Sequence, residues 1–228
     1  GELAADDAER EARFALAAGL AAMLAAPLPA ALAQDTVRIA YSRPYPVART
    51  LAHLEQIADS PYVAPLDSAL DGFIYGHTLG TAGGHYTDEV GRVIPSLPLV
   101  GFRITDPSVP DANKARIVLT SGTHASESTA HLKLEGLINA LISDAPEAVS
   151  LRQRIVFLVY PQVNPEGRWA GYNRSAPEAQ GRDVNRDWRS NEEPLHTAVA
   201  LTQAAILQDT GGSALMSIDF HNLRSGTI

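Results

Sequence analysis

Three short and almost wholly apolar runs constrain the fold of this chain more than any other feature. They are 116–120 (RIVLT), 155–160 (IVFLVY) and 215–220 (LMSIDF), and each predicts a buried strand. Helical patterns lie between them at 126–142 and 193–208, and another precedes them at 47–58. Residues 60–115 are rich in Pro, Gly and Asp and predict loops and short strands. Buried strands that alternate with helices are typical of an α/β fold. We therefore expect a mixed, mostly parallel sheet with helices on both faces.

The composition limits the chemistry available to such a fold. The 228 residues are 45% hydrophobic and 19% charged, as in an ordinary globular protein. The net charge is −8 and no block of Lys and Arg stands out, so we expect no nucleic-acid partner. The chain has no cysteine, which excludes disulfides, thiolate metal sites and a cysteine nucleophile. Any metal site must therefore use histidine and carboxylate ligands.

Residues 1–33 have the features of a secretory leader. An apolar run at 14–26 is too short for a membrane span of about 20 residues, and prolines and an Ala-Leu-Ala site follow it. Residues 1–13 depart from the pattern, because their net charge is −3 where a leader usually carries positive charge. The other interpretation of the run is an amphipathic or buried Ala-rich helix. We expect a signal peptide, a secreted or periplasmic domain at 34–228, and no stable membrane insertion once the leader is removed.

Potential metal ligands follow the first and third predicted strands. His124 and Glu127 lie three residues apart at a strand-to-helix turn, and His221 follows the strand SIDF directly. Open α/β sheets place ligands beyond such strand ends. Two imidazoles and one carboxylate form the ligand set of a catalytic zinc site, whose remaining position is filled by water. Either element alone occurs by chance in many chains, so the pattern needs a further signal.

The loop after the second strand provides that signal. It contains NPEG at 164–167, an Asn-Arg pair at 173–174 and DVNRDW at 183–188. The simplest interpretation is a solvated loop with surface charges. An arginine fork, however, is a natural receptor for a substrate carboxylate, because it donates two parallel hydrogen bonds.

Taken together, H-x-x-E, N-P-E-G, D-V-N-R-D-W and I-D-F-H occur in the order found in zinc metallocarboxypeptidases of the carboxypeptidase A type, and residues 115–222 resemble that family. The resemblance implies a zinc carboxypeptidase-like fold and a Zn²⁺ ion bound by His124, Glu127 and His221. It also implies that Asp183 accepts a hydrogen bond from the far nitrogen of His124 and fixes its tautomer.

The resemblance further implies that the chain hydrolyses the C-terminal peptide bond of peptides or proteins through a metal-activated water. Asn185 and Arg186 would grip the free C-terminal carboxylate of the substrate. Arg174 would polarise the scissile carbonyl and stabilise the developing oxyanion. Loop length varies in the family, so Arg168 and Arg182 compete for this last role.

The sequence departs from the family in two places. Glu166 stands where the family has Asp in N-P-D-G, a turn-forming position at which we expect little catalytic effect. The family's general-base glutamate and specificity pocket lie well downstream of the last ligand, whereas this chain stops at Ile228, seven residues past His221. We therefore expect a fragment that lacks the C-terminal part of the catalytic domain, leaves an apolar face uncovered, and is unstable and inactive alone.

Two other functions remain open from the sequence. A zinc deacylase or amidohydrolase of the same architecture shares H-x-x-E and a later histidine. A non-catalytic module that binds carboxylates would keep the arginine grip without a general base.

The remaining histidines are predicted to have no role at the metal site. We expect surface or loop positions for His53, His77, His85 and His196, which lack ligand spacing. We also expect no ligand role for His131, because the helix begins between it and His124.

Overall fold

The computed structural model describes residues 44–79, 86–87, 91, 93–179, 181–188 and 196–222. The predicted leader, residues 1–33, and the domain boundary after it lie outside the described residues, as does His85.

In the described part of the chain, a first helix is followed by six short strands, after which one or more helices precede each further strand. The helices are α2 (Val47–Ile57), η2 (Asp111–Asn113), α3 (Ser128–Leu141), α4 (Pro146–Arg152), α5 (Pro165–Ala170), η3 (Val184–Arg186) and α6 (Thr197–Thr210), where η marks a 3₁₀ turn. The strands are β1 (Val63–Pro65), β2 (Ile74–His77), β3 (Tyr86–Thr87), β4 (Val93–Ile94), β5 (Pro98–Val100), β6 (Phe102–Ile104), β7 (Ala115–Ser121), β8 (Ile155–Tyr160) and β9 (Met216–Phe220).

A five-stranded sheet in the order β1-β6-β8-β7-β9 forms the centre of the described fold. β8 and β9 both pair in parallel with β7, whereas β6 pairs antiparallel with β1 and β8. The sheet is therefore mixed, as the sequence predicts. The three apolar runs form β7, β8 and β9, which lie side by side.

The continuous apolarity of β8 follows from the cover on both of its faces. Phe157 and Val159 pack with residues of α2 and α3, including Leu54, Leu134 and Ile138. The alternate positions Val156, Leu158 and Tyr160 pack instead with Ala198 and Ala205 of α6. Since successive side chains of a strand point to opposite faces, a strand covered on both sides needs apolar residues throughout.

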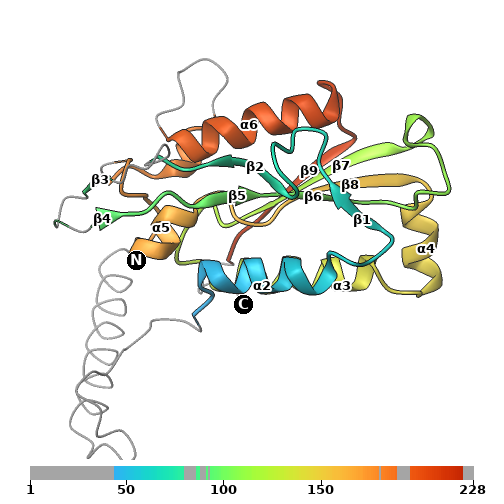
Figure 1. Cartoon of the computed structure of the whole chain (residues 1–228), viewed down its shortest axis with the longest axis horizontal. Helices are drawn as coiled ribbons and strands as arrows, with labels where there is room; N and C mark the ends of the chain where they lie inside the picture. Colours follow the sequence, from blue (N-terminus) through green and yellow to red (C-terminus); the bar gives the residue numbers. More distant parts are fainter. Residues whose placement is uncertain are drawn as a thin grey trace, which may run out of the picture. The chain divides into compact units, whose positions relative to one another are not determined.

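Figure 1 shows the resulting layers, with α6 on one face of the sheet and α2 and α3 on the other. The predicted α/β class with helices on both faces is confirmed. β9 lies at one edge of the described sheet, and Met216 and Ile218 on it are 51% and 36% exposed.

Two short helices were not predicted from the sequence. Each begins with a proline, Pro146 in α4 and Pro165 in α5, which suits the first helical position because its missing N–H needs no partner there. α5 also has a side-chain cap, because the Asn164 side-chain oxygen accepts a hydrogen bond from the Gly167 N–H at 2.9 Å. The N-P-E-G motif is therefore the start of a helix, where the sequence suggested only a turn.

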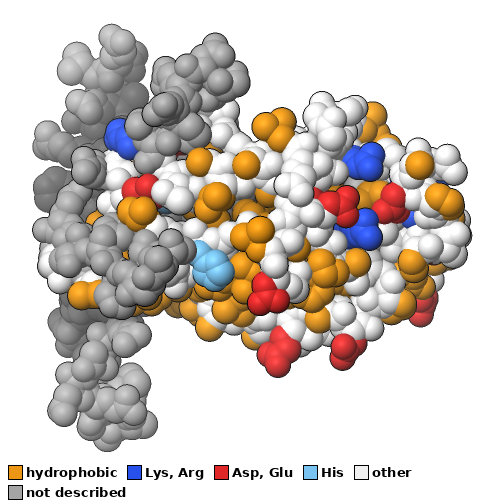
Figure 2. Space-filling view, turned by 45° about the horizontal axis from the view of Figure 1, so that its top comes forward, with side chains coloured by type: hydrophobic (Ala, Val, Ile, Leu, Met, Phe, Trp, Pro, Cys, Tyr) orange, Lys and Arg blue, Asp and Glu red, His pale blue; other side chains and the backbone are white. Residues whose placement is uncertain are grey.

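Among the described helices, none is both long and apolar enough to cross a membrane. On the face drawn in Figure 2, the blue Lys and Arg side chains are few and separated, and hydrophobic side chains lie scattered among polar ones.

Candidate metal centre

The sheet register brings the first and third strand ends to one place. β7 and β9 are parallel neighbours, and the last residues of the two strands, Ser121 and Phe220, are paired. His221 follows Phe220 directly, and His124 follows Ser121 after a short turn. Glu127 is the residue before α3 and makes no side-chain cap there, so its carboxylate is available to both imidazoles.

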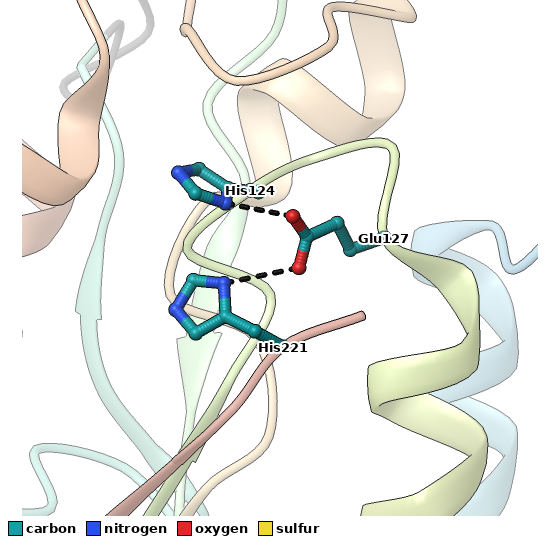
Figure 3. A group of neighbouring side chains, drawn as sticks. All are labelled: His124, Glu127 and His221. Carbon is teal, nitrogen blue, oxygen red and sulfur yellow. Dashed lines mark hydrogen bonds and ion pairs between the residues drawn. The ribbon is translucent and has the colours of Figure 1, made fainter. Parts of the chain in front are cut away.

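Figure 3 shows the side chains of His124, Glu127 and His221 pointing toward one another. Glu127 Oε1 lies 2.9 Å from His124 Nδ1, and Glu127 Oε2 lies 3.0 Å from His221 Nδ1. One potential ligand atom from each residue lies within 4.8 Å of the others. The structure therefore brings together the three ligands that the sequence predicts.

A second carboxylate holds the far nitrogen of each imidazole. His124 Nε2 lies 2.9 Å from Asp183 Oδ1, and His221 Nε2 lies 2.6 Å from Asp219 Oδ2. A proton on each Nε2 satisfies these contacts and leaves both Nδ1 lone pairs facing Glu127. Carboxylates that orient imidazoles in this way are typical of zinc sites.

Sequence reasoning anticipated the contact of Asp183 but missed that of Asp219. The signal was available, because Asp219 lies two positions before His221 and side chains two apart in extended chain share a face. Asp219 is also held from the sheet, since the Thr120 hydroxyl donates to its other oxygen at 2.9 Å.

The electrostatics favour a charged carboxylate between the rings. Burial raises the pKa of Glu127, but the Asn222 backbone N–H, at 2.7 Å from Oε2, and the two imidazoles outweigh burial and leave this pKa below its ordinary value. The pKa of His221 is raised, chiefly by its hydrogen bond to Asp219. A negatively charged carboxylate thus lies between the two Nδ1 atoms, which favours a cation bound among the three side chains. This donor set fits Zn²⁺, which takes imidazole nitrogen and carboxylate oxygen.

Among the three candidate arginines, Arg174 lies nearest the paired His124 and Asp183. Its Nε is 3.6 Å from Asp183 Oδ2 and 3.3 Å from His124 Nε2. That imidazole nitrogen cannot donate to Asp183 and also accept from Arg174, and we assign it as the donor because the carboxylate is the closer partner. Arg168 donates instead to the Ser128 hydroxyl, and Arg182 to the Ala179 carbonyl.

Asp183 connects the metal ligands to the Asn185-Arg186 pair. Its Oδ1 accepts the Asn185 backbone N–H at 3.0 Å and so caps the short helix η3, while the same atom contacts His124. Arg186 at the end of η3 is exposed, and Asn185 is half-buried. Asn185 and Arg186 thus lie two and three positions after Asp183, whose side chain contacts the potential ligand His124.

The prediction of a surface or loop position is wrong for His53, whereas His196 does lie in the loop before α6 but is buried there. His53 is 9% exposed, because it lies on the core side of α2, where its Nε2 is 2.9 Å from Asn139 Oδ1. His196 is 1% exposed, immediately before α6. His77 is exposed, as predicted. His131 is buried and stacked on Tyr45, with 4.6 Å between ring centroids, and it is not one of the three clustered residues.

Replacing Asp219 with alanine should weaken zinc binding at the His221 site by roughly 10–100-fold, the usual effect of losing a residue that orients a ligand. Competition with a chromophoric chelator measures this change. Thr120→Val is the matched control, because it removes only the hydrogen bond to the other Asp219 oxygen. Zinc affinity equal to that of the parent in Asp219→Ala would show that this carboxylate does not orient His221.

Comparison with known proteins identifies the family. The family model described as Zinc carboxypeptidase matches residues 86–210, more than half of the chain. The chain belongs to the zinc carboxypeptidase family. His221 lies past the matched residues, so its place in the site is supported by the geometry above.

Two curated proteins similar to this chain are cytosolic carboxypeptidase 1 of Danio rerio and cytosolic carboxypeptidase 4 of Mus musculus. The first is 31% identical over 107 residues, which are 46% of this chain and 9% of the relative. The second is 27% identical over 200 residues, which are 82% of this chain and 16% of the relative. The matched part of this chain thus corresponds to a small share of the curated relatives' length.

Solved carboxypeptidase structures share the fold. A putative carboxypeptidase A from Shewanella denitrificans aligns with a TM-score of 0.56 at 22% identity, covering 79% of this chain and 40% of that one. Carboxypeptidase A from Helicoverpa armigera aligns with a TM-score of 0.54 at 15% identity, covering 86% of this chain and 50% of that one.

The relatives also correct the predicted location. The curated relatives are named cytosolic carboxypeptidases, and this finding contradicts the prediction of a secreted or periplasmic protein. The physical reason for the error is the weight given to one apolar run. The net charge of −3 on residues 1–13 already departed from the positive charge of a secretory leader.

Proposed function

We propose that this chain carries the metal-binding and carboxylate-recognising part of a metallocarboxypeptidase, within a partial catalytic domain at 34–228. Its substrate is a peptide or protein with a free C-terminal carboxylate, and the reaction is hydrolysis of the last peptide bond. The observation that carries the proposal is the pair of imidazoles that face Glu127 through Nδ1, each held at Nε2 by its own carboxylate.

In this proposal His124, Glu127 and His221 hold Zn²⁺. When bound, the ion supplies a Lewis acid for the scissile carbonyl and lowers the pKa of a coordinated water toward about 7. Asp183 and Asp219 each accept the proton of the nearby Nε2, so that Nδ1 of each imidazole is the atom left to bind the ion. His124 and His221 lie close to the ends of β7 and β9, so the sheet keeps both imidazoles in place before substrate binds.

The arginine loop binds the substrate in this proposal. Arg186 and Asn185 receive the C-terminal carboxylate through charge-assisted hydrogen bonds. Arg174, beside the His124–Asp183 pair, donates to the carbonyl oxygen as it gains negative charge. The proposal gives the general-base role to no residue of this chain.

The zinc-loaded chain should bind an N-acyl dipeptide with a free carboxylate at least about tenfold more tightly than its C-terminal amide. Hydrogen bonds to a charged group contribute about 1.5–3 kcal/mol, and 1.4 kcal/mol corresponds to tenfold. Arg186→Ala should remove this preference. Isothermal titration calorimetry with both peptides measures it.

Arg154→Ala is the matched control, because Arg154 lies outside the arginine loop, just before β8, and donates a hydrogen bond to the Ser150 carbonyl. The control should keep the preference for the acid. Equal affinity for the acid and the amide in the parent would contradict the carboxylate grip. Binding of N-acyl amino acids in place of dipeptides would favour the deacylase. Release of the C-terminal amino acid, followed by mass spectrometry, separates hydrolysis from binding alone.

A further inference from the structure

A second group of potential metal ligands lies apart from the three residues of the first centre. It consists of Glu166 on α5, Glu178 in the following loop, and His196 immediately before α6. One potential ligand atom from each lies within 4.8 Å of the others. Glu166 is 0% exposed and His196 is 1% exposed, so the group lies largely inside the protein.

His196 is the least expected member of this group. Both of its ring nitrogens are buried and neither has a hydrogen-bond partner within the described part of the chain. Glu178 Oε2 lies 3.9 Å from Nε2, which is too far for a hydrogen bond. Buried polar groups are normally satisfied, so a buried imidazole that lies beside two carboxylates without a hydrogen bond is well placed to bind a cation.

Glu178 is oriented as a ligating carboxylate would be. Its oxygens accept the Thr197 backbone N–H at 2.9 Å and the Thr197 hydroxyl at 2.6 Å. Metal-binding carboxylates are typically hydrogen-bonded in this way by neighbouring groups. Two donors of a tetrahedral zinc site lie about 3.4 Å apart, given bonds of about 2.0–2.2 Å. The 3.9 Å between His196 and Glu178 is already close to that spacing.

The protonation state of His196 also suits a metal ligand. Burial, and to a lesser extent Arg182, lowers the pKa of His196 to about 4, so the imidazole is neutral at pH 7, which is the form that binds a metal ion.

We propose that Glu166, Glu178 and His196 form a second metal site, which takes a divalent transition-metal ion of the Zn²⁺ class. Imidazole with carboxylates suits such ions, and water completes the coordination. The ion joins α5, the loop after it and the start of α6. These segments flank the residues that carry Arg174 and Asp183, so the site has a structural role that is separate from the first centre.

The number of zinc ions bound by the full chain tests the proposal. After removal of metal with a chelator, titration with Zn²⁺ and elemental analysis should give two ions per chain. His124→Ala should keep one ion, His196→Gln should keep one, and the double variant should keep none. Zn²⁺ should still raise the melting temperature of His124→Ala but should not raise that of the double variant.

Glu178→Gln guards against a folding artefact. The amide oxygen of this variant can still accept the hydrogen bond from the Thr197 backbone N–H at the start of α6. The negative charge of the carboxylate is lost, so we expect at least tenfold weaker binding of the second ion. His53→Gln is the matched control for loss of a buried histidine and should keep two ions. The proposal is overturned if the parent binds a single ion, or if His196→Gln and Glu178→Gln both keep the second one. Failure of the first centre would instead remove the ion that depends on His124.

Discussion

The Glu127→Ala variant should lose zinc at the first centre, with affinity lowered by at least about a thousandfold, well beyond the roughly 10–100-fold expected for a residue that only orients a ligand. Glu127 contacts both His124 and His221 and supplies the negative charge among the three ligands. Without it, two neutral imidazoles remain, and neither their number nor their charge suffices for a tight zinc site.

The measurement is best made in a His196→Gln background, in which we expect only the first centre to bind zinc. Glu135→Ala is the matched control, because Glu135 lies on the adjoining helix α3 and pairs with Arg49 at 2.9 Å. The control should bind zinc as the parent does. Retention of tight zinc binding in Glu127→Ala would exclude this carboxylate as a ligand.

The Gly122→Ala variant should lower the free energy of unfolding by about 2–5 kcal/mol. Gly122 has a φ of +76°, a conformation that costs other residues about 1–2 kcal/mol. A Cβ atom there would lie 2.5 Å from Cε1 of His131, which is buried against Tyr45 and has little room to move. The expected strain falls two residues before His124, so zinc affinity should fall as well.

Two other glycines separate the causes of this effect. Gly171 has a φ of +79°, but a Cβ atom added there would meet no heavy atom within 4 Å, so Gly171→Ala should show the backbone cost alone. Gly136 lies inside α3 with the same open space, and Gly136→Ala should stabilise the helix by about 0.5–1 kcal/mol. Urea unfolding measures all three. A Gly122→Ala cost no larger than that of Gly171→Ala would contradict the steric part of the argument.

The sequence carried most of the information needed for the sheet. β7 and β8 were recognisable because strands covered on both faces are largely apolar, and Val156–Tyr160 alternate between two cores. β9 was recognisable from its apolar run alone, because it lies at the edge of the described sheet with Met216 and Ile218 exposed. α4 and α5 escaped notice because six or seven residues are too few for a helical period to stand out.

The candidate site was predictable as far as local motifs reach. His124 and Glu127 share a motif, and the parallel register of β7 and β9 brings His221 to them. The clustering of His196 with Glu166 and Glu178 was not predictable, because the three residues are distant in sequence and share no regular spacing. Side chains that meet only through the tertiary fold leave no periodic signal.

Anomalous X-ray scattering from crystals of the zinc-loaded chain, recorded on both sides of the zinc absorption edge, tests the first centre most directly. We expect a zinc peak about 2.0–2.2 Å from His124 Nδ1, His221 Nδ1 and a carboxylate oxygen of Glu127. Zinc bound through the Nε2 atoms, or the absence of a peak within bonding distance of all three side chains, would contradict the account.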